Sequence, residues 1–214
     1  LPSSARRCTP PRPPLSNKVQ RHLEASKFQI KFFATGGIGG VHLNAENTND
    51  VSADLYALSE NSNFVICSGA KSILDLNKTN ELLETLGITR IGYQTNYMPG
   101  FWYEETENKV DNKFDEIHEI SSFLKLNENM ENKKSILIFN KVPLEKALNK
   151  NDVEKWINNA TIKADRNNIS GKELTPFLIK EINEQSKNET LNANVSLIIN
   201  NANLAGKIAK SFYS

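Results

Sequence analysis

Two short apolar runs that end in small-residue turns most constrain how this chain can fold. The first covers residues 28–34 (FQIKFFA) and leads into the turn TGGIGG. The second covers residues 63–68 (NFVICS) and leads into Gly69, Ala70 and Lys71. Runs of this length that are apolar and rich in β-branched or aromatic residues are typical of buried strands. The glycines that follow predict sharp turns at the strand ends.

Helical patterns alternate with these strands. Residues 71–86 predict an amphipathic helix that ends at Gly87, and residues 88–93 predict a third strand. Residues 135–139 (SILIF) predict a fourth strand, and we expect a surface insertion at residues 104–115. This strand–helix–strand alternation is typical of an α/β sheet.

Three more helices are predicted in the last third of the chain: residues 152–166, 175–186 and 191–212. The last carries apolar residues on much of its circumference, such as Val195, Leu197 and Ile198. We therefore expect this helix to be deeply buried, in part at a subunit contact.

The turn at residues 35–40 (TGGIGG) has two interpretations. Successive backbone N–H groups in a glycine-rich turn can bind an anion such as phosphate, with Thr35 and His42 as further donors. The alternative is a purely structural turn. The turn is not a P-loop, because no Gly-Lys-Ser/Thr follows it, and its spacing differs from the dinucleotide fingerprint GxGxxG.

The stretch Asp50-Val51-Ser52-Ala53-Asp54 also has two interpretations. Ser52 suits the N-cap of a helix, with Asp54 in the first turn. Alternatively, Asp50 holds a hard divalent cation such as Mg²⁺ or Mn²⁺, and Ser52 and Asp54 bind a polar substrate.

Lys71 follows a buried strand among small residues. At that strand end of an α/β sheet a ligand can bind. Desolvation lowers the pKa of a lysine, so the neutral amine can attack a carbonyl group and form a Schiff base. The alternative is a lysine that extends into solvent at a helix start.

Several long motifs resemble one family. The stretches FATGGIGGVH, DVSADL, SGAKSILD and TLGITRIGYQTNYMPGFWY, with ISGKELTPFLIKEINEQS and TLNANVSLIINNANLAGKIA near the end, are similar to the pseudouridine-5'-phosphate glycosidases. The resemblance extends from about Ile30 to Ile208. It implies that residues 28–214 form a partial domain of this family. It implies a three-layer α/β/α fold with a central mixed sheet, and a homotrimer.

The resemblance also implies an activity. Family members are manganese-dependent enzymes that reversibly cleave the C–C glycosidic bond of pseudouridine 5'-phosphate, giving uracil and ribose 5-phosphate. Lys71 falls on the lysine that forms the imine at C1', and Asp50 on the metal ligand. An imine at C1' provides the electron sink, and a general acid protonates the departing uracil. The positions expected to bind substrate are Ser52, Ala53, Asp54, Thr35, His42 and Asn194.

The first 27 residues do not resemble the family. In the family, the preceding third of the protein holds the general-acid Glu and a second substrate-binding Lys. Residues 1–27 are rich in Pro and Arg, which favours an extended or disordered segment outside the family pattern. An alternative function is therefore a catalytically incompetent sugar-phosphate-binding remnant or subunit. A dinucleotide-binding domain built on the glycine turn is a third hypothesis.

Composition narrows the remaining classes. The formal net charge is +1, so no global field attracts nucleic acid. Two cysteines give neither a disulfide framework nor a metal-binding spacing. No apolar run approaches the length of a membrane span. We expect a soluble protein, cytoplasmic by default, with an organelle (mitochondrion or peroxisome) as the alternative suggested by the Arg-rich start.

Overall fold

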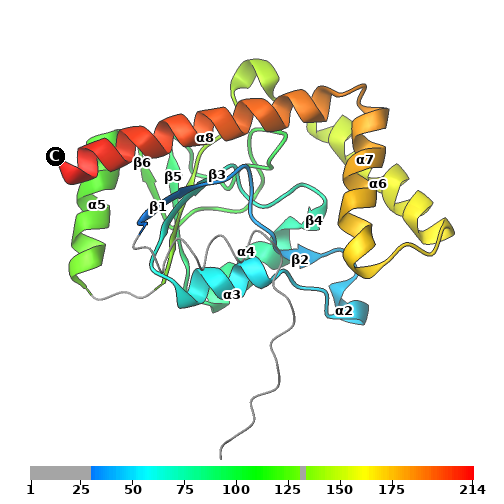
Figure 1. Cartoon of the computed structure of the whole chain (residues 1–214), viewed down its shortest axis with the longest axis horizontal. Helices are drawn as coiled ribbons and strands as arrows, with labels where there is room; N and C mark the ends of the chain where they lie inside the picture. The colour runs from blue at the N-terminus through cyan, green and yellow to red at the C-terminus, as the bar shows by residue number, and fades with distance from the viewer. Residues whose placement is uncertain (1–29, 131–133) are drawn as a thin grey trace, which may run out of the picture.

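The computed structural model describes residues 30–130 and 134–214 (Figure 1). The main sheet has five strands in the order β1-β3-β7-β5-β6. These strands are β1 (Phe32–Ala34), β3 (Phe64–Cys67), β7 (Ile136–Phe139), β5 (Thr89–Tyr93) and β6 (Asn112–Phe114). The expected disordered segment at residues 1–27 lies outside the described residues. All four predicted strands are present, each somewhat shorter than its apolar run.

Neighbouring strands of the main sheet are parallel throughout. Antiparallel pairing between named strands of the described residues is confined to β2 (Val41–His42) and β4 (Leu74–Asp75). Parallel neighbours need long crossover connections, and α3 (Ala53–Glu60) and α4 (Leu76–Thr85) lie in two of them. The described sheet is therefore parallel rather than mixed, and the α/β class is confirmed.

One face of the sheet is covered by α5 (Ile117–Asn129) and the second half of α8 (Glu189–Tyr213). Figure 1 shows α8 running along this side, with α5 beside its C-terminal end. Phe64 and Ile66 of β3 face this layer. Burial on both faces explains why the strands read as continuous apolar runs rather than alternating ones.

The opposite face packs against α3 and α4, through residues such as Leu55 and Leu83. Val65 and Cys67 of β3 point toward this layer, because successive side chains of a strand alternate. The sheet therefore lies between two helical layers, and the three-layer α/β/α arrangement is confirmed (Figure 1). Cys67 is a buried thiol that is not part of a disulfide, and Cys8 lies outside the described residues.

A helical pair, α6 (Lys150–Arg166) and α7 (Leu174–Gln185), packs beside this second layer and continues its core. Short helical segments complete the described fold: α2 (Ala45–Thr48), η1 (Leu144–Lys146) and η2 (Gly171–Glu173). Within the described residues, no helix is both long and apolar enough to cross a membrane.

The helix predicted from residue 71 begins only at Leu76. Asp75 is its N-cap, and the Asp75 side chain accepts a hydrogen bond of 2.9 Å from the backbone N–H of Lys78. Leu74 and Asp75 itself form β4, and their pairing with β2 prevents an earlier start. Gly87 has a φ of +63° directly after the last turn, as expected for a glycine that ends a helix.

Two other predictions needed correction. The segment at residues 104–115 contains the edge strand β6, where a surface insertion was expected. The first half of α8 is not deeply buried but presents an apolar stripe to solvent. The stripe consists of Leu191, Val195, Ile198 and Ile199. Its spacing follows one side of the helix, opposite the side that packs on the core.

Candidate active site

A cavity of about 220 Å³ lies at the carboxyl ends of β1 and β3. Its polar lining comes from Thr35, Lys71 and Asn194, and its apolar lining includes Phe101 and Trp102. We call it the lysine pocket. Ligands of open α/β sheets bind at this edge, because the loops that follow parallel strands meet there. Three of the predicted site residues are thus brought together.

Lys71 lies in an irregular segment between β3 and β4. Its backbone N–H donates to the carbonyl oxygen of Ile38 at 3.1 Å, and the preceding Ala70 pairs with Ile38 across the two strand ends. The Lys71 residue is half-buried. The alternative placed Lys71 at a helix start, and that placement is wrong, because α4 begins only at Leu76.

Asn194 enters the lysine pocket from α8. Its side-chain oxygen accepts a hydrogen bond of 2.9 Å from Trp102 Nε1. The bond fixes the amide plane, so the NH₂ group is the part that can donate to a bound molecule. Phe101 and Trp102, in the loop at residues 97–103, therefore line the pocket and are themselves buried.

The other predicted site residues gather around the second half of the glycine turn. Ser52 is the N-cap of α3, its side chain accepting from the Asp54 backbone N–H at 3.2 Å, and Ala53 is the first residue of the helix. His42 Nδ1 lies 3.8 Å from Asp50 Oδ2. The structure therefore places Asp50, His42 and the residues of the helix start in one group.

The backbone N–H groups of the glycine turn are largely used within the protein. Gly39 N–H donates to Asp54 Oδ2 at 2.8 Å, Ile38 N–H to Gly69 O at 3.0 Å, and Val41 N–H to a threonine hydroxyl. At these positions the structural interpretation holds, since a protein carboxylate already occupies the place of an anion. A Cβ on Gly39 would lie 2.1 Å from Ser52 Oγ, which explains the glycine there.

The glycine turn also contradicts the dinucleotide hypothesis. In that fingerprint, the turn leads into a helix whose N-terminus receives the pyrophosphate. Here the turn leads into β2, and the next helical residues begin at Ala45.

Asp50 is the predicted metal ligand, and its side chain is 38% exposed. Among the described residues, no group of three or more His, Cys, Asp or Glu side chains could hold a metal ion. A lone carboxylate suits a hydrated hard cation such as Mn²⁺ or Mg²⁺, which retains several waters, rather than Zn²⁺. The donor set at Asp50 therefore fits a cation held mostly by water.

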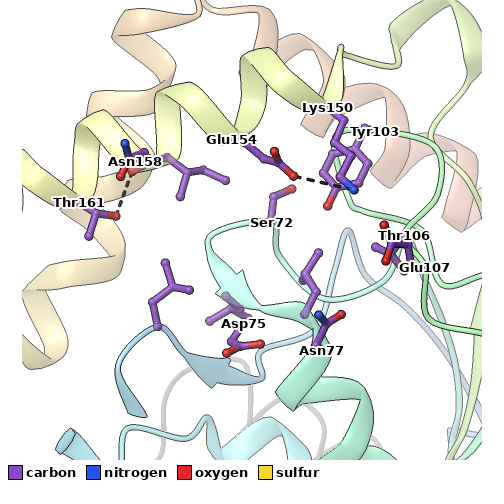
Figure 2. Close-up of a pocket in the computed structure, with 14 residues that line it drawn as sticks. Ser72, Asp75, Asn77, Tyr103, Thr106, Glu107, Lys150, Glu154, Asn158 and Thr161 are labelled. Carbon is purple, nitrogen blue, oxygen red and sulfur yellow. Dashed lines mark hydrogen bonds and ion pairs between the residues drawn. The ribbon is translucent and has the colours of Figure 1, made fainter. Parts of the chain in front are cut away.

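A second and larger hollow, of about 490 Å³, lies between α6 and the β4–α4 segment. Figure 2 shows Glu154 and Lys150 of α6 on one side, with Asp75 and Asn77 on the other. Three carboxylates and one lysine make its lining net negative, with Glu107 as the third acid. An anionic ligand is therefore better suited to the lysine pocket.

Tyr103 lies in the larger hollow and is itself buried. Burial, and secondarily the charge of Glu154, raises the pKa of the Tyr103 phenol to about 12. The phenol therefore stays protonated at neutral pH and can only donate or accept a hydrogen bond there.

Sequence reasoning missed Asn201 of α8, which is fully buried beneath the lysine pocket and bonded to Thr35 O at 2.9 Å. A signal was available. Asn201 occurs at helical spacing among Leu197, Leu204 and Ile208, where an apolar residue would be expected. An amide on the buried face of a helix indicates a buried hydrogen-bond network.

A three-layer α/β protein with a half-buried lysine in a pocket at the carboxyl edge of its sheet has the plan of a small-molecule-binding domain. The chain belongs to the family described as indigoidine synthase A like proteins, whose family model matches residues 21–211.

Two of the curated proteins that are similar to this chain share one name. A protein from Petrotoga mobilis, named pseudouridine-5'-phosphate glycosidase, is 46% identical over 183 residues, which are 86% of this chain and 60% of the relative. A protein of the same name from Staphylococcus aureus is 45% identical over 180 residues, covering 84% of this chain and 59% of the relative. The resemblance to these glycosidases is confirmed, and the chain spans about 60% of their length.

Solved structures agree with this assignment. The prealnumycin C-glycosynthase AlnA in complex with ribulose 5-phosphate superimposes with a TM-score of 0.84 at 30% identity, covering 89% of this chain and 63% of AlnA. An indigoidine synthase A (IdgA)-like protein from Thermotoga maritima gives a TM-score of 0.79 at 34% identity, covering 87% of this chain and 61% of that protein.

Proposed function

We propose that this chain carries the imine-forming part of a pseudouridine-5'-phosphate glycosidase. The observation that carries the proposal is the position of Lys71 in a pocket with Thr35 and Asn194, in a chain about 45% identical to proteins of that name. The overall reaction converts pseudouridine 5'-phosphate and water into uracil and ribose 5-phosphate.

The proposed chemistry uses the Lys71 amine as nucleophile. Lys71 Nζ attacks C1' and the ring C1'–O bond breaks. The ring oxygen takes up the proton that the amine loses, so the open sugar carries a hydroxyl group and a secondary amine on C1'. A proton is then added to uracil C5, the C1'–C5 bond breaks, and its electrons stay with the base. The nitrogen lone pair forms the C1'=N imine at the same time. Water hydrolyses the imine, which returns the Lys71 amine and releases ribose 5-phosphate.

Substrate binding is assigned to the residues around this lysine. The Asn194 amide and the Thr35 hydroxyl can donate to oxygens of the sugar phosphate, and the ribulose 5-phosphate complex of AlnA supports a ligand of this class. His42, Ser52, Ala53 and Asp54 remain proposed substrate contacts at the adjoining turn. Asp54 already accepts from Gly39 N–H, so its role there is to shape the turn as well.

Asp50 is the proposed ligand of a Mn²⁺ ion, which would supply positive charge near the sugar phosphate. Its exposed carboxylate is free to share the cation with water molecules, as a hard divalent ion prefers. His42, 3.8 Å from this carboxylate, is placed to orient it.

The proton for uracil C5 needs a donor outside the lysine pocket. None of the described residues that line the pocket is an acid. The second candidate function follows from this observation: a sugar-phosphate-binding subunit that forms the imine but does not release uracil. The apolar stripe of α8, whose Ile198 also lines the pocket, supports the further proposal of association into a homotrimer.

The first experiment traps the imine. The chain is incubated with ribose 5-phosphate, reduced with borohydride and analysed by intact mass and peptide mapping. We expect a single adduct at Lys71 that is lost in Lys71→Ala. Lys78→Ala is the matched control, because Lys78 is exposed and paired with Glu46. An adduct that persists in Lys71→Ala, or none in the unchanged chain, contradicts the proposal.

Turnover distinguishes the two candidate functions. Uracil released from pseudouridine 5'-phosphate is followed chromatographically with Mn²⁺ and after chelation of the metal. Adduct formation with uracil release supports the glycosidase, and adduct formation without uracil release supports the binding subunit. Asp50→Asn should abolish the dependence on Mn²⁺ while leaving the fold unchanged.

A further inference from the structure

Asn201 contacts the ends of three strands beneath the lysine pocket. Its Nδ2 donates to Thr35 O at 2.9 Å, directly after β1, and to Ser68 Oγ at 3.1 Å, directly after β3. Its Oδ1 accepts from Asn140 Nδ2 at 3.0 Å, directly after β7. The side chain is 0% exposed. Figure 1 shows α8 passing beside β1 and β3.

These strand ends continue into the two walls of the pocket. Ser68 N–H donates to Gly36 O at 2.8 Å, and Lys71 N–H donates to Ile38 O at 3.1 Å, so the segments after β1 and β3 are bonded to each other. Asn201 Nδ2 lies 3.4 Å from Gly36 O as well. One side chain therefore contacts both segments where they adjoin the cavity.

Only an amide of this size meets all of these groups. Asparagine offers two donor hydrogens and an acceptor oxygen, whereas leucine offers neither and aspartate cannot donate to Thr35 O. Buried backbone and side-chain polar groups need partners, so loss of the amide would leave Thr35 O and the Asn140 amide unsatisfied at the pocket floor.

We infer that Asn201 is a positioning residue for the imine chemistry at Lys71. It sets the separation between the wall at residues 35–38 and the wall at residues 68–71 without touching the ligand, since it does not line the cavity. This inference rests on the proposed function of the lysine pocket. It adds to that function a residue that acts by holding the two pocket walls in place.

The test compares Asn201→Leu with Asn200→Leu. Asn200 is the adjacent residue of α8, and its side chain donates to Lys141 O at 3.1 Å, away from the pocket walls. Hydrogen exchange is measured on peptides covering residues 35–38 and 68–71, and adduct trapping is measured against ribose 5-phosphate concentration. Both are measured well below the melting temperature of each variant.

In Asn201→Leu, exchange should accelerate in these two peptides and not in α5. The maximal trapping rate should fall about 10- to 100-fold, because small displacements of a nucleophile have effects of this size. The half-saturating concentration of ribose 5-phosphate should change less than about threefold, since the ligand contacts remain. Asn200→Leu should behave as the unchanged chain.

Unchanged exchange and trapping in Asn201→Leu would overturn the inference, as would a uniform increase of exchange over the whole chain. If Asn201→Leu does not fold, Ser68→Ala replaces it and should accelerate exchange at residues 68–71 alone; no acceleration there would equally overturn it. If the unchanged chain forms no adduct, the proposed function fails, and the exchange comparison alone decides the role of Asn201.

Discussion

Trp102 Nε1 donates a hydrogen bond of 2.9 Å to Asn194 Oδ1, joining residues 92 positions apart in the sequence. Trp102 belongs to the aromatic loop after β5, and Asn194 to the first half of α8. The bond closes one wall of the lysine pocket and orients the amide of Asn194. Ligand binding in the lysine pocket should therefore depend on Trp102, because Trp102 orients the Asn194 amide.

Trp102→Phe keeps an aromatic ring in the wall but removes the donor. The Asn194 amide then loses its fixed orientation, and the half-saturating concentration of ribose 5-phosphate in the trapping assay should rise about 5- to 10-fold, as expected for one hydrogen bond. Trp156→Phe on α6 is the control. Equal effects of the two substitutions would contradict the assigned role.

Arg90 and Asp111 form a partly buried ion pair that holds the loop between β5 and β6. Arg90 Nη2 lies 2.6 Å from Asp111 Oδ1, and the Arg90 side chain is 6% exposed. Asp111→Ala leaves a buried guanidinium with fewer partners, so the free energy of unfolding should fall by about 3 kcal/mol. Urea unfolding at neutral pH measures the change.

Glu84→Ala is the control for this pair. Glu84 lies 3.5 Å from the same guanidinium, but its side chain is 68% exposed. The free energy of unfolding should change by less than about 0.5 kcal/mol, as for most exposed ion pairs. If Glu84→Ala lowers the free energy of unfolding as much as Asp111→Ala does, the greater effect assigned to the more buried ion pair is wrong.

Gly69 separates β3 from Lys71 in a conformation that only glycine tolerates well. Its φ is +84°, and a Cβ would lie 2.0 Å from Pro99 O. Gly69→Ala should lower the free energy of unfolding by at least about 3 kcal/mol, because strain and overlap add. Gly206→Ala on α8 meets no atom within 4 Å and should stabilise by about 0.5–1 kcal/mol. Thermal unfolding of both variants gives the comparison.

Because of Tyr103, the free energy of unfolding should depend on pH in the alkaline range. The folded-state pKa of about 12 lies above the ordinary tyrosine value of 10.0, so the unfolded chain loses the phenolic proton first as pH rises. The stabilisation is complete below the unfolded pKa and is lost as pH rises through the folded pKa. It amounts to at most about 2–3 kcal/mol.

Urea unfolding at about pH 9 and about pH 11 should show this loss of stability. Tyr103→Phe should remove that component and leave the contribution of the other titrating groups. An identical pH dependence in Tyr103→Phe would show that the phenol ionises normally.

Much of the fold could be predicted from the sequence because the central strands are buried on both faces. Continuous apolar runs such as residues 135–139 predict buried strands, and Gly87 predicts the end of a helix. The edge strand β6 (Asn112–Phe114) could not be predicted, since two of its three residues are exposed and polar. The late start of α4 depends on pairing between β2 and β4, a tertiary contact that local propensity does not register.

The candidate site was predictable in part for the same reason. Lys71 and Thr35 follow recognisable strands, so their approach at the sheet edge follows from the α/β plan. Asn194 was a candidate from family resemblance, and its bond to Trp102 could not be read from sequence. The use of Gly39 N–H by Asp54 depends on where α3 begins relative to the turn, which is also a tertiary relationship.

The bond between Asn201 and Thr35 also bears on folding kinetics. These residues are 166 positions apart, and the parallel sheet between them is built entirely from distant pairings. The chain loses entropy when such long loops close, before the contacts that stabilise them have formed. Refolding should therefore be slow compared with helical proteins of this size. The lysine pocket would then be among the last parts to form, and intermediates with unpaired strand edges would be prone to aggregate until α8 docks.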